Sequence, residues 1–172
     1  MYSTKADRNM LKTIIAKFKY KMQYGRKVQI GRKFRCRNAF FIAIENAGEI
    51  TIGEHVFFNN ACSISALGHV KIGDNCLFGE NVKIYDHNHI FNLKAGLSIA
   101  TQGMSVGNVK VGNNCWIGSN CILLKGAKIG DNCVIGAGCI INCEIPSNSL
   151  VRSKKELQIE EIRYTNKSIQ NE

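Results

Sequence analysis

The 172-residue sequence lacks a long apolar run. No stretch approaches the roughly 18 consecutive apolar residues that a transmembrane helix needs. Residues 10–22, MLKTIIAKFKYKM, are too interrupted by lysine for the apolar core of a signal peptide. We therefore expect a soluble, cytoplasmic protein of one domain, in which this segment forms a short amphipathic helix with Leu11, Ile14, Ile15 and Phe18 on one face.

Acidic residues are scarce near the N-terminus. Positions 1–37 hold 12 Lys and Arg residues against one acid, Asp7, whereas the remainder holds 11 basic and 12 acidic residues. The segment suits peripheral contact with an anionic membrane surface, a polyanion or acidic glycans, and equally suits a solvated basic face. We predict no nucleic-acid partner.

The spacing Cys-x-x-Cys is absent although the chain has eight cysteines, which excludes a zinc ribbon. Without an export signal, a disulfide framework is not expected either. Six cysteines instead keep one position of a repeat, where we interpret them as small buried hydrophobes: Cys62, Cys76, Cys115, Cys121, Cys133 and Cys139.

A six-residue period dominates what the sequence does contain. A branched apolar residue recurs every six positions, and a small residue follows it four positions later. The apolar series is Val111, Ile117, Leu123, Ile129, Ile135 and Ile141, with earlier members Ile52, Phe58, Ile64, Ile72, Phe78 and Ile84. The two early runs are offset by eight, which places a two-residue insertion near Leu67-Gly68.

This period predicts an all-β solenoid, a left-handed parallel β-helix of triangular coils with Gly-Asp and Gly-Asn steps supplying the positive-φ corners. We expect a basic segment with a short helix over 1–27, the β-helix over 28–150 and a tail over 151–172. Residues 85–108 break the period and form one long loop insertion, longer than a compact domain usually tolerates without a purpose.

The sequence resembles the hexapeptide-repeat acyltransferases, most closely their galactoside, maltose and xenobiotic O-acetyltransferase branch. The blocks CWIGS (115–119), IGAG (135–138) and EIPSNSLV (144–151) carry the resemblance, together with the position of the insertion. The resemblance implies a homotrimer that moves acetyl from acetyl-CoA to a saccharide hydroxyl, on a surface glycan or its precursor. It implies no metal.

The resemblance also implies roles for single residues. Relatives use a histidine as general base, five residues after the last inward aliphatic, and this count from Ile84 reaches His89. His87 and Asp86 are its expected catalytic neighbours, with Asp86 or a backbone carbonyl orienting the base. Asn59 matches an acceptor-binding asparagine, and Asn88 is placed with it.

The expected coenzyme site follows the same blocks. The residues implied for acetyl-CoA are Trp116, Gly118, Ser119, Gly136, Ala137, Lys154 and Lys155. The two lysines stand where relatives carry a Gly-Asn-Pro-Ala-Lys type motif, and Ile90 replaces the proline that follows the histidine in maltose-type enzymes. The acceptor therefore does not follow from those enzymes.

Other interpretations stay open at this level. His87 and His89 could chelate a metal, although His55 and His69 do not complete the three-histidine pattern of the solenoid carbonic anhydrases. The histidine loop could be merely polar and solvated, with His55 and His69 on the surface. The enzyme could acetylate an amine on an amino-sugar nucleotide, or the solenoid could be a non-catalytic scaffold.

Overall fold

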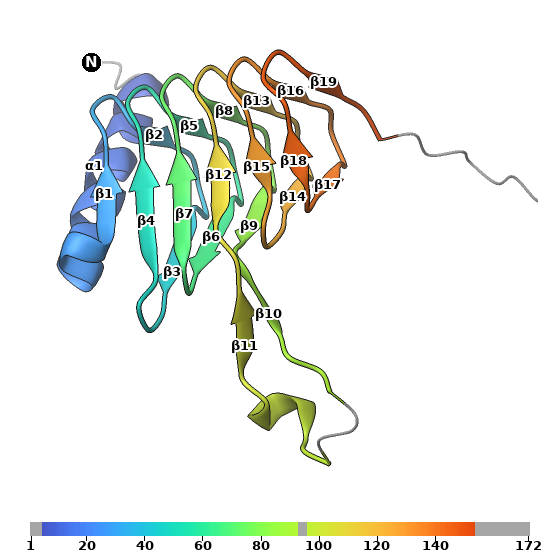
Figure 1. The fold of residues 1–172 in the computed structure, drawn as a ribbon. Helices are drawn as coiled ribbons and strands as arrows, with labels where there is room; N and C mark the ends of the chain where they lie inside the picture. The colour runs from blue at the N-terminus through green and yellow to red at the C-terminus, as the bar shows by residue number, and fades with distance from the viewer. Residues whose placement is uncertain (1–4, 93–95, 154–172) are drawn as a thin grey trace, which may run out of the picture.

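The chain forms a parallel β-solenoid with one helix at its first coil and one arm projecting from its side (Figure 1). The structure is a computed structural model that describes residues 5–92 and 96–153. Sheet A contains β1 (Val28–Ile30), β4 (Glu49–Ile52), β7 (His69–Ile72), β12 (Val109–Val111), β15 (Lys128–Ile129) and β18 (Glu144–Ile145). Sheet B contains β2 (Arg35–Cys36), β5 (Phe57–Phe58), β8 (Leu77–Phe78), β13 (Trp116–Ile117), β16 (Val134–Ile135) and β19 (Leu150–Val151). Sheet C contains β3 (Phe41–Ile44), β6 (Ser63–Ala66), β9 (Lys83–Tyr85), β14 (Ile122–Leu123) and β17 (Ile140–Ile141).

The coils shorten along the chain. In sheet A, Val28 pairs with Ile50 and Ile50 with Val70, whereas Val111 pairs with Ile129, 18 positions on. The early coils are longer because β3, β4, β6 and β7 each hold four residues around the corner between sheets C and A. The insertion read near Leu67-Gly68 belongs to this corner, from which the arm leaves one coil later.

Every residue of the six-residue apolar series is buried, so the predicted inward positions are confirmed. The six cysteines of the small position are buried as well, and none is in a disulfide. Burial raises the pKa of the Cys62 and Cys121 thiols, as expected for core side chains rather than nucleophiles. The first coils are filled by aromatic rings, of which Phe58 and Phe78 stack with centroids 4.2 Å apart.

The corners use glycine differently from the sequence prediction, which was wrong about the positive-φ positions. At the corner between sheets A and B, the left-handed conformation belongs to Asn75, Asn114 and Asn132, with φ of 54–57°. The preceding Gly73 and Gly112 are needed for close approach, because a Cβ on either would lie within 2.5–2.8 Å of the next coil. Asparagine tolerates the left-handed region and also bonds along the column, as Asn114 does to Oδ1 of Asn132 at 2.9 Å.

Helix α1 (Lys5–Tyr24) closes the open edge of the first coil. The Tyr20 hydroxyl donates to the Phe40 carbonyl at 2.9 Å and accepts the Ile42 N–H at 3.2 Å. The Thr13 hydroxyl accepts the Cys36 N–H, so helix side chains bond backbone groups that lack a neighbouring strand. The predicted helix over 10–22 is confirmed and is longer, and the side that packs on the solenoid carries Thr13, Ala16, Tyr20 and Tyr24 rather than the stripe of Leu11, Ile14, Ile15 and Phe18.

The described part of the insertion contains an antiparallel ribbon. β10 (His87–His89) pairs with β11 (Met104–Val106), and a 3-10 turn, η3 (Ile99–Thr101), lies beyond it. The ribbon leaves the corner between sheets C and A and points away from the solenoid (Figure 1).

Candidate active site

Asp86 anchors the arm to the solenoid. Its carboxylate is fully buried and accepts the backbone N–H groups of Leu67 at 2.9 Å and Gly68 at 2.8 Å, one coil earlier. Its own carbonyl accepts the Gly107 N–H at 2.8 Å, where the arm returns. Both ends of the insertion therefore meet at this residue, and the histidines that follow start from a fixed point.

The structure joins Asp86 to His87 and gives His89 a different environment. Asp86 Oδ1 lies 2.9 Å from His87 Nδ1, and the His87 side chain is 15% exposed. His89 lies on the same side of β10, exposed, opposite Met104. Asn88 points to the other side of the ribbon and is also exposed. Asp86 was predicted as one of two groups that could orient His89, but in the structure it contacts His87 instead.

Most of the residues predicted to bind the coenzyme lie in or beside a column along the corner between sheets B and C, which we call the coenzyme column. The backbone N–H groups of Asn59, Gly79, Gly118 and Gly136 each donate to the coil that follows, at 2.7–3.0 Å. A Cβ on Gly118 would lie 2.6 Å from the Ala137 nitrogen, so only glycine lets these coils approach so closely.

Side chains beside this column supply a polar edge and an aromatic wall. Ser119 Oγ accepts the Glu80 N–H at 3.0 Å, and Ala137 is exposed at the equivalent place one coil on. Trp116 stands on the outer face of sheet B with 55% of its surface exposed. An exposed indole next to a backbone groove can cover an extended thioester ligand.

The predicted site residues form two groups, the histidine ribbon and the coenzyme column, and these two groups are far apart within one chain. The histidines sit at the corner between sheets C and A, whereas Asn59, Ser119 and Ala137 sit at the corner between sheets B and C. The width of sheet C separates them, far beyond hydrogen-bond reach. Lys154 and Lys155 lie outside the described residues.

No group of three metal-ligating side chains occurs within residues 5–92 and 96–153. His55 is exposed at a left-handed corner position, whereas His69 lies beside the base of the arm, where its backbone N–H donates to Asn108 Oδ1 and its ring lies 3.6 Å from Glu49. None of the helices in this part of the chain is long and apolar enough to cross a bilayer.

Sequence reasoning missed Arg37, whose Nη1 donates to Asn59 Oδ1 at 3.2 Å. Arg37 occupies the same place in the column as Asn59, because its N–H bonds the Phe58 carbonyl as that of Asn59 bonds the Phe78 carbonyl. The offset of 22 positions between the two residues hid the match, since the repeat was read with 18-residue coils.

Comparisons with known proteins agree with this architecture. The family description "Bacterial transferase hexapeptide (six repeats)" matches residues 108–143, and "Hexapeptide repeat of succinyl-transferase" matches residues 69–84. A search among curated sequences found no significant match.

Solved structures extend the match over most of the chain. A maltose O-acetyltransferase from Clostridium difficile 630 is 31% identical, with a TM-score of 0.61 over 72% of this chain and 64% of its own. A galactoside acetyltransferase in complex with coenzyme A is 31% identical, with a TM-score of 0.53 over 66% of this chain and 60% of its own. A hexapeptide-repeat-containing acetyltransferase from Vibrio cholerae, complexed with acetyl-CoA, has the same fold at 24% identity and a TM-score of 0.63, over 82% of this chain and 79% of its own.

The chain thus spans less than two thirds of the first and second of these relatives. The six-residue period, the three parallel sheets and the matches over residues 69–84 and 108–143 nevertheless point the same way. The chain belongs to the hexapeptide-repeat acyltransferase superfamily, and its solenoid is the left-handed parallel β-helix of that group.

Proposed function

We propose that the protein is an O-acetyltransferase that moves acetyl from acetyl-CoA to a hydroxyl of a saccharide, as on a surface glycan or its precursor. The observation that carries the proposal is the glycine column with Ser119, Ala137 and Trp116 beside it. Two relatives with this fold hold acetyl-CoA or coenzyme A, and two at 31% identity are named for maltose and galactoside. No resident metal or prosthetic group is part of the proposal.

His89 is the proposed general base. Its imidazole is exposed on the ribbon and is available to take the proton of an acceptor hydroxyl, which then attacks the thioester carbon. The tetrahedral oxyanion needs a hydrogen-bond donor, for which we propose the backbone N–H groups of Ser119 and Ala137, because those of Gly118 and Gly136 already bond the next coil. His87, held by Asp86, is a positioning residue that fixes the ribbon, and Asn88 and Asn59 are proposed acceptor contacts.

A homotrimer completes the site. Because the ribbon projects from one corner and the coenzyme column lies on another, a histidine of one subunit can meet the column only of a neighbour (Figure 1). Sheet B supports such packing, since its outer face carries exposed Leu77, Trp116 and Leu150 in one row. The acceptor would lie between two subunits.

Paired substitutions on the ribbon test the mechanism. His89→Ala should lower kcat for acetyl transfer about 10²–10⁴-fold with the thermal midpoint unchanged. His87→Ala is the matched control, and it should lower the midpoint through the lost Asp86 contact while retaining more activity. Thiol release measured with hydroxyl and amino acceptors separates O- from N-acetylation. Full turnover in His89→Ala would refute the assignment, and absence of CoA binding by calorimetry would favour a scaffold.

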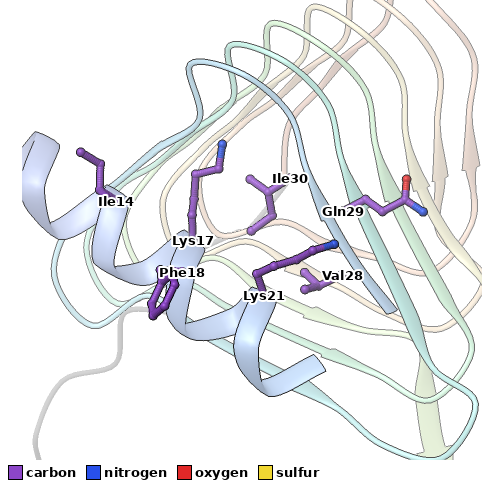
Figure 2. A pocket seen from close by; sticks show the side chains of 7 residues that line it. All are labelled: Ile14, Lys17, Phe18, Lys21, Val28, Gln29 and Ile30. Carbon is purple, nitrogen blue, oxygen red and sulfur yellow. The ribbon is translucent and has the colours of Figure 1, made fainter. Parts of the chain in front are cut away.

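The outward side of α1 supports peripheral contact with an anionic membrane surface from the cytoplasm. Its large apolar residues recur at the spacing of a helical stripe and are 56–72% exposed: Leu11, Ile14, Ile15, Phe18 and Met22. Lysines flank the stripe, with Lys17 and Lys21 on the side that faces β1 (Figure 2). An apolar stripe bordered by cations is typical of a helix that lies in a lipid interface.

Vesicle sedimentation tests this contact. The full chain should bind phosphatidylcholine vesicles that contain about 30 mol% phosphatidylglycerol, and it should dissociate from them as the salt concentration rises. Ile15→Gln/Phe18→Gln should abolish binding. Ile140→Gln/Leu150→Gln changes similarly exposed residues at the other end of the solenoid and should retain it. Equal binding by both variants, or binding without the anionic lipid, would refute the proposed surface.

A further inference from the structure

A cationic groove lies at the N-terminal end of the coenzyme column. It has a volume of about 920 Å³, with α1 on one side and strands β2 and β5 on the other. Five of the side chains that line it carry or can carry positive charge: Lys17, Lys33, Arg35, Arg37 and His55. None of its lining residues is acidic.

Two guanidinium groups converge inside this groove. The Arg35 and Arg37 guanidinium carbons lie 5.5 and 5.7 Å from the centre of the same ring, Phe57. The π-face of the ring favours each cation. Both cations lie beside one ring and no acidic residue lines the groove, so their like charges repel one another without a compensating anion. Arg32, just outside the groove, has a carboxylate partner in Glu54 at 2.9 Å. Arg37, which lines the groove, donates to the neutral Asn59 amide.

The groove is continuous with the proposed acceptor position. Arg37 is the column equivalent of Asn59 and lies one coil away, which is about 4.8 Å in a parallel sheet. That spacing is comparable to the width of one pyranose ring. A saccharide whose hydroxyl is held at Asn59 would therefore place a substituent of the same or the next sugar at Arg37 and Arg35.

We propose that this groove is a subsite for an anionic group of the acceptor, a phosphate or carboxylate carried by the saccharide. The inference rests on the proposed acetyl transfer and specifies its substrate class. Guanidinium groups bind both oxyanions through paired N–H donors, and an anion between Arg35 and Arg37 would offset their mutual repulsion. Neutral sugars would leave that repulsion in place.

Acceptor kinetics test the subsite. Thiol release from acetyl-CoA would be measured with glucose, glucose 1-phosphate and glucuronic acid, which separate a phosphate from a carboxylate as the source of the charge. We expect at least one anionic sugar to exceed glucose in kcat/KM. Arg35→Gln/Arg37→Gln should raise KM for that sugar about 10- to 100-fold more than KM for glucose, as loss of charge-assisted hydrogen bonds implies.

A matched variant controls for net charge. Lys71→Gln/Lys110→Gln removes the same two charges from exposed, paired positions on the outer face of sheet A, and should leave the acceptor preference unchanged. Equal use of neutral and anionic sugars, or an equal loss in this control, would overturn the subsite. A rise in KM for acetyl-CoA in the arginine variant would overturn it too, because the groove would then hold coenzyme phosphates.

The failure of acetyl transfer itself is distinguishable. If no sugar releases thiol, inorganic pyrophosphate titrated by calorimetry reports on the groove alone. Binding that the arginine variant loses and the lysine variant keeps would still support an anion site. No binding of pyrophosphate to the native protein would overturn it.

Discussion

Replacing Asp86 with asparagine tests whether this buried carboxylate fixes the histidine ribbon. The native side chain accepts N–H groups of Leu67 and Gly68 on different oxygens and also contacts His87. Asparagine has one carbonyl oxygen, so in either orientation its NH₂ group faces a backbone N–H donor. One buried donor then has no acceptor, and the bond that remains loses its charge.

An unsatisfied buried donor costs about 1–3 kcal/mol, and the weaker remaining bond adds to this, so we expect a loss of roughly 2–4 kcal/mol. For a chain of this size each kcal/mol lowers the thermal midpoint by about 2–4 °C, which predicts a decrease of about 4–16 °C by calorimetry. Acetyl transfer should fall with it, because the ribbon loses its anchor. The thermal midpoint and the rate of acetyl transfer should therefore decrease together, because both depend on the hydrogen bonds of Asp86.

Asp131→Asn is the matched control. Asp131 Oδ1 accepts the Asn113 N–H at 2.6 Å at an exposed corner, and Asn113 performs the same role for Asp74 one coil earlier. The amide is therefore sufficient there, and we expect a change below about 0.5 kcal/mol. If Asp86→Asn were as mild as this control and retained full activity, the anchoring role would be refuted.

Three further substitutions probe the solenoid. Gly118→Ala should lower the thermal midpoint by several degrees, because its Cβ would lie 2.6 Å from the Ala137 backbone. Gly136→Ala should lower it less, because the nearest atom to its Cβ is 3.1 Å away. Similar midpoints for the two variants would contradict the argument that Gly118 is needed for close approach. Tyr20→Phe removes a buried hydroxyl that bonds two backbone groups of the first coil and should lower the free energy of unfolding in urea by about 1–3 kcal/mol. An unchanged urea midpoint would show that α1 does not cap this edge through Tyr20.

The sequence predicted the core well because a solenoid repeats its environment. Ile117 and Ile135 lie 18 positions apart in the sequence and pair on neighbouring coils, and both are buried. The place of a residue in the repeat therefore predicts whether it is buried. The direction of the α1 stripe was not predictable in this way. It depends on the first coil needing hydrogen-bond partners for an open edge, which brings Thr13 and Tyr20 inward and leaves Phe18 outside.

The site was predictable only where it follows the regular repeat. Ser119 and Ala137 fall on consecutive coils of equal length and lie at one corner, as an 18-residue coil requires, while their coenzyme role stays a prediction. The contact between Asp86 and His87 was not predicted, because counting residues from Ile84 selects a histidine by its position and does not indicate which side chains form hydrogen bonds. The signal that was present is the insertion at Leu67-Gly68, one coil below Asp86, which makes room for the two N–H groups that bind it.

One column of equivalent positions links the fold to the proposed chemistry. Gly118 and Gly136 let the C-terminal coils approach closely, since a Cβ on either would lie 2.6 or 3.1 Å from the backbone of the next coil. In the longer N-terminal coils the same positions are Asn59 and Arg37, whose side chains reach outward and bond one another. In the proposed function, the change from glycine to polar side chains along a single corner would separate the coenzyme from the acceptor. It also sets the order in which thioester, hydroxyl and anionic substituent would lie along the solenoid.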